Sequence, residues 1–215
     1  MRNEGIPIVK EGLPFFFVLL VGAIASGIGG WHWLSIPLAV AALYTAYFFR
    51  NPERLPPVGS ATVACPADGK VIFVGESKEV DFTDGLMKKV SIFMSLFDVH
   101  VNRVPVDGTV KNSKYHRGRF MAAFEDQASD ENERSALLIE TSRGEKIVVV
   151  QIAGLIARRI ICYPAIGSFV LKGQRLGLIR FGSRCDLYLP MSSEILVKVG
   201  DKVLGGETIV AHLKT

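Results

Sequence analysis

The sequence predicts a mostly β domain preceded by a hydrophobic helical hairpin. Two observations indicate this fold class. Residues 13–49 contain no Lys, Arg, Asp or Glu, and the remainder of the chain is dense in short strand-like patterns. The 215 residues are 49% apolar, which is enough for a full core. We expect a membrane-associated hairpin with its exit linker in residues 1–54 and a β-rich domain in residues 55–215.

The uncharged run is too long for one helix. A membrane-spanning helix needs about 20 apolar residues, and this run is nearly twice that length, with a glycine-rich break at residues 27–30. Its length also argues against a cleaved signal peptide. A hairpin that crosses the bilayer and one that only dips into it both fit, because the second half is short.

The charges beside the hairpin predict its orientation. Basic residues precede and follow the run, whereas the connection between its halves has none. The positive-inside rule then places both ends in the cytoplasm, at the inner face of the cell membrane, with Trp31 and Trp33 at the far interface. The basic residues that flank the run are Arg2, Lys10, Arg50 and Arg54.

Composition excludes several classes of partner. The formal net charge of +4 comes from basic residues interleaved with acidic ones, which does not suggest nucleic acid binding. The three cysteines are scattered and lack a C-x-x-C spacing, so we expect reduced thiols in a cytoplasmic domain. His, Cys, Asp and Glu do not cluster with metal-ligand spacing, and we expect no metal.

The β patterns are clearest at four places. Residues 70–74 and 90–94 are short strand-like runs, and residues 136–140 and 146–150 form a predicted hairpin around a turn at 142–145. We therefore expect the soluble part of the chain to be mostly β.

The C-terminal segment suggests a more specific architecture. From Val197 the chain reads V-x-x-G-D-x-V-x-x-G-x-x-I, and Pro66-Ala67-Asp68-Gly69 occurs earlier. This pairing resembles the barrel-sandwich hybrid of biotinyl and lipoyl carrier domains, in which glycine turns join short strands. The chain has no modifiable lysine at a predicted hairpin tip, so a carrier role is disfavoured. A membrane-tethered barrel-sandwich adaptor without enzymatic activity stays open as an alternative.

One strand-like stretch, GLIRFGSRCDLYLP in residues 177–190, carries Gly182-Ser183 in its middle. Taken alone, the pair indicates a bulge or a tight bend. The motifs G-x-S-x-G and S-x-x-K are absent, as are glycine-rich phosphate loops. An enzyme built from this chain would therefore need its electrophile from another source.

The sequence also contains candidate acid-base groups. In Asp98-Val99-His100 the two ionisable residues would share one face of a strand, and a carboxylate beside an imidazole can fix its tautomer. Asp68 in an Asp-Gly turn and His116 are weaker candidates. Each residue also fits an ordinary structural role.

Four spaced motifs together resemble phosphatidylserine decarboxylase over nearly the whole chain. They are PADG at residues 66–69, FDVHVNRVP at 97–105, NER at 132–134, and K-G-x-x-x-G-x-x-x-F-G-S at 172–183. The hydrophobic hairpin followed by FFRNPER at residues 48–54 is similar to the short prokaryotic branch, type A. The resemblance implies a lyase that makes phosphatidylethanolamine and CO2 from phosphatidylserine in the membrane.

The resemblance implies autocatalytic cleavage between Gly182 and Ser183. It would give a large chain (1–182) and a small chain (183–215), which stay together as a heterodimer that could assemble further. Ser183 would become a covalent pyruvoyl group, the cofactor, which forms a Schiff base with the substrate amine. Glycine suits the position before Ser183 because it leaves the attacked carbonyl open.

The resemblance also suggests roles for other residues. Asp98 and His100 would do the acid-base work of the site, and Asp68 would orient the histidine that activates Ser183. The family's second histidine is replaced by Arg103 here, which makes His116 the expected processing base, with His100 as the alternative. The candidate ligands of the lipid phosphate are Arg158, Arg159, Lys172 and Arg184. A pyruvoyl decarboxylase for a related serine lipid or a soluble amino acid is the alternative enzyme.

Overall fold

The computed structural model describes residues 7–118, 132–154, 159–180 and 182–214. Contacts within the chain divide it into two compact units, one of residues 3–53 and one that contains residues 54–215. Arg54 thus belongs with the β unit, one residue earlier than the boundary that we expected.

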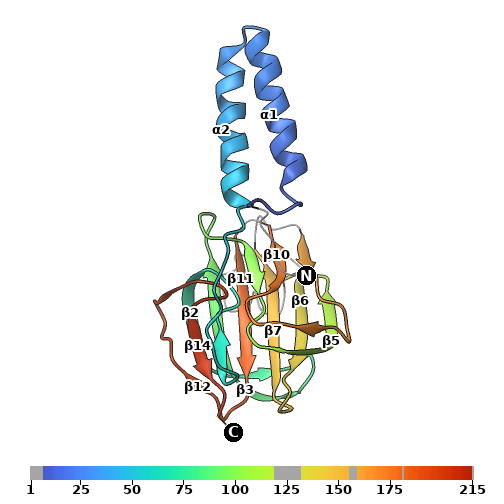
Figure 1. The fold of residues 1–215 in the computed structure, drawn as a ribbon, viewed down its shortest axis with the longest axis vertical. Coiled ribbons are helices and arrows are strands. Elements are labelled where there is room, and N and C mark those ends of the chain that lie inside the picture. Colours follow the sequence, from blue (N-terminus) through green and yellow to red (C-terminus); the bar gives the residue numbers. More distant parts are fainter. Residues whose placement is uncertain (1–6, 119–131, 155–158, 181, 215) are drawn as a thin grey trace. The chain divides into compact units, whose positions relative to one another are not determined.

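The first unit is a helical hairpin of α1 (Leu13–Ile28) and α2 (His32–Phe48), shown in Figure 1. The helices meet through small side chains. The Ser35 hydroxyl donates a hydrogen bond to the Ala23 carbonyl at 2.8 Å, and a Cβ on Gly27 would lie 3.2 Å from the Ser35 oxygen. The predicted break is confirmed, because α1 ends at Ile28 and Gly30 adopts a left-handed φ of +77°.

The hairpin exposes many large apolar side chains. Among the described residues, no helix combines the length and the apolar character needed to cross a membrane. The side chains at least half exposed are Phe17, Val18, Val21, Ile24, Ile28, Trp31, Trp33, Ile36, Val40 and Leu43.

The second unit is built on an eight-stranded antiparallel sheet. The predicted strands at 70–74 and 90–94 are confirmed, and so is the hairpin at 136–150, in which Glu140 pairs with Lys146. In spatial order the strands are β13 (Lys202–Val203), β2 (Gly69–Glu79), β3 (Gly85–Met94), β11 (Ser183–Leu189), β7 (Lys146–Ala153), β6 (Arg134–Glu140), β5 (Gly108–His116) and β9 (Phe169–Val170).

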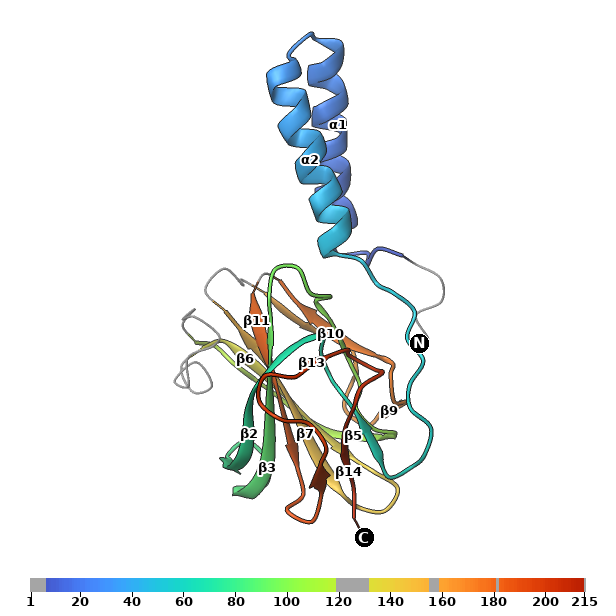
Figure 2. The same ribbon diagram turned by 90° about the vertical axis from the view of Figure 1, so that its left-hand side faces the viewer.

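Two three-stranded sheets complete the β unit. Figure 2 labels β14 of one and β10 of the other. One has the order β1 (Thr62–Ala64), β14 (Ile209–His212), β12 (Glu194–Ile195), and the other β4 (Val101–Arg103), β10 (Arg175–Ile179), β8 (Ile160–Cys162). The main core contains residues of all three sheets, including Ile92 and Leu187 of the large sheet with Val210 and Leu176 of the small ones. The mostly β fold class is confirmed, and the finer barrel-sandwich likeness stays a prediction.

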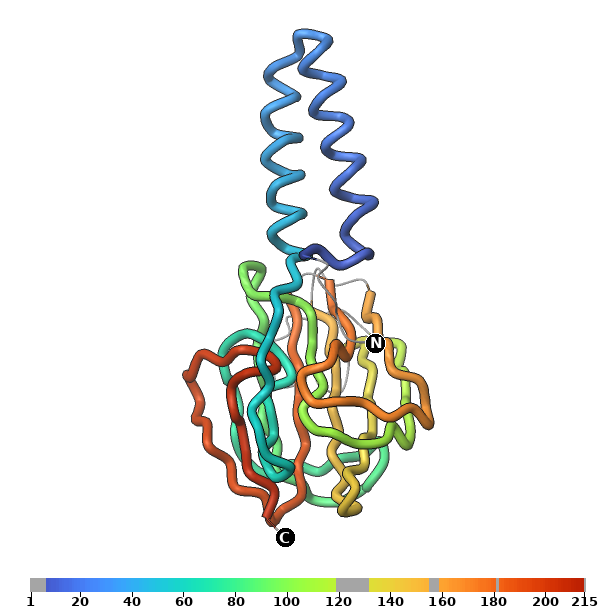
Figure 3. Tube along the Cα trace, in the orientation of Figure 1, coloured from blue at the N-terminus to red at the C-terminus, as the bar shows by residue number. Residues whose placement is uncertain are grey.

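The two glycine-turn motifs of the sequence meet in space. Figure 3 shows the C-terminal segment lying beside the early strands of the β unit. The Val71 amide donates to the Asp201 carbonyl at 2.9 Å, and Val203 pairs with Gly69. Gly69 has a φ of +151°, and a Cβ there would lie 2.1 Å from the Phe93 carbonyl oxygen. The close approach of two backbones therefore requires glycine at this position.

Candidate active site

The Gly182-Ser183 pair lies where the chain changes sheets. β10 ends at Ile179 in a small sheet, and β11 begins at Ser183 in the large one. Gly182 has a left-handed φ of +54°, and a Cβ there would meet no described atom within 4 Å beyond its two chain neighbours. Glycine is favoured here by its backbone conformation and not by lack of space. The stretch 177–190 is thus two strands joined by a bend.

Ser183 is fully buried at the first position of a central strand. It pairs with Met94 of β3 on one side and with Ala153 of β7 on the other. Its hydroxyl lies 3.4 Å from the Met94 sulfur, toward which it donates. Thioether sulfur is a weak acceptor, so this contact orients the hydroxyl without holding it strongly.

Two buried amides extend this cluster, and sequence reasoning missed both. The Asn102 side-chain amide donates to the Met94 sulfur at 3.5 Å and to the Pro66 carbonyl at 3.4 Å. The Gln151 amide donates to the Asn102 side-chain oxygen at 2.8 Å. A signal was present, because Gln151 is the one polar residue within the apolar run from Ile147 to Ala153.

His100 is buried just before β4, and its setting corrects one expectation. Residues 98–100 form a turn and its exit, so Asp98 and His100 do not share a strand face. The Asp98 carboxylate accepts hydrogen bonds from the Ser95 amide (2.7 Å) and hydroxyl (2.6 Å). The His100 Nδ1 lies 2.9 Å from the Asp98 backbone carbonyl, which can only accept. Nδ1 therefore carries the proton, and Nε2 is the basic nitrogen of the neutral ring.

Asp68 is held in a buried ion pair. Its carboxylate accepts from the Arg54 guanidinium at 2.6 Å and from the Gly205 amide at 2.7 Å. The same loop is tied to β4, because the Arg103 amide donates to the Pro66 carbonyl at 2.8 Å. The segments that carry Asp68, His100 and Ser183 thus converge on the end of the unit where Met94 and Asn102 meet.

His116 lies on the other face of the large sheet. It pairs with Arg134, which pairs with Ile152, which in turn pairs with Arg184. Residues in register share a face, and Arg184 points away from the face of its neighbour Ser183. The His116 Nε2 lies 2.6 Å from an Asp81 carboxylate oxygen. This register does not support His116 as the base that activates Ser183.

The candidate phosphate ligands are not gathered at one place. Arg158 lies outside the described residues, and Arg159 is exposed. The Lys172 ammonium donates to the carbonyls of Gly59 (2.7 Å) and Thr62 (3.0 Å), and burial lowers its pKa. Lys172 and Arg184 are thus both engaged with groups of the protein, the latter with Asp186.

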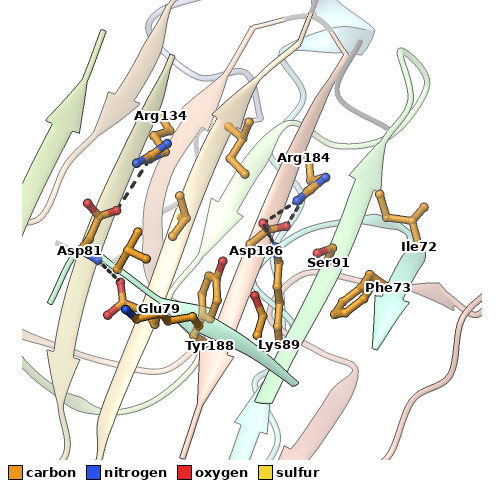
Figure 4. Close-up of a pocket in the computed structure, with 15 residues that line it drawn as sticks. Ile72, Phe73, Glu79, Asp81, Lys89, Ser91, Arg134, Arg184, Asp186 and Tyr188 are labelled. Carbon is orange, nitrogen blue, oxygen red and sulfur yellow. Dashed lines mark hydrogen bonds and ion pairs between the residues drawn. The ribbon is translucent and has the colours of Figure 1, made fainter. Parts of the chain in front are cut away.

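Arg184 and Asp186 line a cavity of about 450 Å³ on the outer face of the large sheet (Figure 4). The guanidinium contacts both carboxylate oxygens, at 2.7 and 2.9 Å, and the Lys89 ammonium lies 3.1 Å from one of them. Burial opposes ionisation of Asp186, but the Arg184 hydrogen bonds and the two positive charges outweigh it and lower its pKa. The strand thus has a buried ion pair on one face and Ser183 on the other.

Comparison with known proteins identifies the family. The family model for phosphatidylserine decarboxylase matches residues 41–211. A protein of Geotalea uraniireducens named phosphatidylserine decarboxylase proenzyme is 47% identical over 213 residues, which cover 99% of this chain and 100% of that protein. Proteins of the same name from Geobacter sulfurreducens and Syntrophotalea carbinolica are each 45% identical, over 99% and 100% of this chain and all of their own length.

These similarities identify the class of protein: the chain is an enzyme of the carboxy-lyase type. It belongs to the phosphatidylserine decarboxylase family, as the four sequence motifs predicted. The word proenzyme in the relatives' name describes proteins that are processed.

We expect Asp186→Asn to lower the free energy of unfolding by about 3–5 kcal/mol at neutral pH, because it leaves two buried cations without their carboxylate. The lowered pKa of Asp186 adds stability above its ordinary value of 3.8, and that stability is lost as the pH falls below it. The gap between the variant and the unaltered protein should therefore narrow in acid. Urea unfolding at several pH values measures both effects.

Asp84→Asn is the matched control for this prediction. Asp84 forms an ion pair with Lys78 at 2.8 Å, but both side chains are largely exposed. Its loss should leave the unfolding midpoint unchanged. Equal destabilisation by the two variants would contradict the role assigned to the buried pair.

Proposed function

We propose that this chain decarboxylates phosphatidylserine to phosphatidylethanolamine, using a pyruvoyl group made from its own Ser183. The observation that carries the proposal is the buried serine after a left-handed glycine at the junction of two sheets. The membership of the family and the proenzyme name of its relatives support it.

Self-cleavage would begin with attack of the Ser183 hydroxyl on the Gly182 carbonyl. The Oγ–C bond forms as the C–N bond breaks, which converts the amide to an ester. β-Elimination then releases Gly182 as a carboxylate, and hydrolysis of the remaining enamine, through its imine, gives ammonia and the pyruvoyl group. Gly182 suits this step because its left-handed φ is one that glycine adopts readily, and it has no Cβ to obstruct the attack.

His100 is the residue best suited to accept the proton of the Ser183 hydroxyl. It is buried two residues before Asn102, whose side chain contacts the Met94 sulfur, and its tautomer presents a basic Nε2. The same imidazole would serve later as an acid beside the substrate carbon. Asp68, in the adjoining loop, would support this arrangement through its contacts with Arg54 and Gly205. The pyruvoyl carbonyl, once formed, would accept the substrate amine and take up the electrons that CO2 leaves behind.

The chain pairing explains how the two products would stay together. β11, at the start of the small chain, is hydrogen-bonded to β3 on one side and to β7 on the other, both in the large chain. β14 pairs with β1, and β13 with β2. Cleavage before Ser183 would thus leave a heterodimer held by these four strand pairings.

The hairpin would hold the enzyme at its substrate. Its helices expose apolar side chains such as Phe17, Val21 and Trp33, which suit the acyl region and interface of a bilayer. The basic residues on both sides of the hairpin favour the cytoplasmic face of the cell membrane. Phosphatidylserine could then keep its acyl chains in the bilayer while its headgroup reaches the β unit.

We expect purified protein to contain a C-terminal fragment of residues 183–215 whose first residue is blocked and carries a carbonyl. Ser183→Ala should remain a single chain, because it lacks the attacking hydroxyl. Intact-mass spectrometry measures both. The other Gly-Ser pairs, at residues 59–60 and 167–168, serve as internal controls. A fragment of residues 168–215, or an intact chain with full activity, would overturn the assignment.

Variants of the two histidines should differ in their rate of self-cleavage. His100→Ala should slow self-cleavage by about 10²- to 10⁴-fold, the usual contribution of a general acid-base group. His116→Ala should cleave normally, because its ring lies on the other face of the sheet. Gel analysis of freshly translated protein gives the rates. An uncleaved His116→Ala protein with an unchanged melting temperature would return the processing role to His116.

Removing residues 1–53 should leave a β unit that folds and cleaves itself, because Arg54 keeps its ion pairs with Asp68 and Glu207. Its CO2 release from phosphatidylserine vesicles should fall by about 10²-fold or more, since the hairpin raises the local substrate concentration. Release from a soluble short-chain analogue should not change. Equal losses on both substrates would contradict the anchoring role, and CO2 release from free serine would favour a soluble substrate.

A further inference from the structure

A pair of buried amides lies beside the cleavage serine. We call Asn102 and Gln151 the amide clamp; their side chains are 0% and 1% exposed. Asn102 comes from β4 in a small sheet and Gln151 from β7 in the large sheet, and they are joined by a 2.8 Å hydrogen bond. The amide clamp is thus a polar bridge between two of the sheets.

The amide clamp reaches Ser183 through one sulfur atom. Asn102 donates to the Met94 sulfur at 3.5 Å, and the Ser183 hydroxyl lies 3.4 Å from the same sulfur. Gln151 pairs with Cys185, two residues beyond Ser183, so both face the same side of the sheet. Asn102 also donates to the carbonyl of Pro66, at the start of the loop that carries Asp68.

The amide clamp stabilises the fold less than two apolar side chains would in the same space. Within the described part of the chain, the Gln151 side-chain oxygen is buried without a hydrogen-bond partner. A buried polar atom that lacks a partner lowers stability, and two apolar side chains of the same shape would avoid that loss. Such groups tend to be kept where they serve a function.

We propose that Asn102 and Gln151 are positioning residues for self-cleavage. The amide clamp fixes the Met94 sulfur, and the sulfur directs the Ser183 hydroxyl toward the Gly182 carbonyl. This inference rests on the proposed self-cleavage between Gly182 and Ser183. The inference adds no chemical step. It assigns the alignment of the Ser183 hydroxyl with the Gly182 carbonyl to two amide side chains, which do no acid-base chemistry themselves.

The test compares Asn102→Leu, Gln151→Met and the double variant in pulse-labelled translation, with the loss of precursor followed on gels. Each single variant should cleave about 10²-fold more slowly, which is the scale of a misaligned reacting group. The double variant should cleave no more slowly than the worse single variant, because the two amides act as one unit. Its melting temperature should stay close to that of the unaltered protein, since both partners are replaced together.

The pH profile separates positioning from proton transfer. The cleavage rate of each variant should fall by a constant factor across the pH range, because the base is unchanged. Ile147→Ala is the stability control: this residue lies on the same strand and face as Gln151 but pairs with Ile139, away from Ser183. It should lower the melting temperature and leave the cleavage rate unchanged.

Met94→Leu tests the same contact if the amide variants do not fold, and it should also cleave slowly. A folded double variant, or Met94→Leu, that cleaves at the unaltered rate would overturn the inference while the proposed function stands. If the unaltered chain is not cleaved between Gly182 and Ser183, the proposed function itself fails and the inference fails with it.

Discussion

The pairing of β11 between β3 and β7 is the constraint on which the site depends. It fixes Ser183 at the first position of a central strand, opposite Met94 and Ala153, with its backbone held on both sides. A loop could present a serine, but it could not hold the hydroxyl and the preceding carbonyl as rigidly. The left-handed Gly182 lets the chain turn from the small sheet into the large sheet immediately before Ser183.

Much of the fold could be predicted because it depends on local patterns. An uncharged run with a glycine break predicts a helical hairpin, and alternation with a Ser-Arg-Gly-Glu turn predicts a β hairpin; the structure has both. The family was predicted from the spacing of four motifs, and the comparisons confirm it. These signals lie within short windows of sequence and need no knowledge of strand order.

The site was harder to predict because it depends on register. His116 is an apparent candidate in sequence, but three successive strand pairings place it on the face opposite Ser183. The sequence predicted that the Asp98 carboxylate supports His100, but the contact is made by the Asp98 backbone carbonyl. Gln151 looked like part of an apolar strand, and only the pairing of β7 with β11 shows which side it faces.

The buried ion pair of Arg184 and Asp186 has a consequence for folding accuracy. These residues alternate along β11 with Cys185 and Leu187, which belong to the apolar core. A strand that slipped by one position would place both charges in that core and the apolar side chains opposite Lys89. The ion pair therefore favours the observed register of β11 over one shifted by a single residue. A chain that assembles β11 in the shifted register would not place Ser183 at the end of the strand, directly after the bend at Gly182.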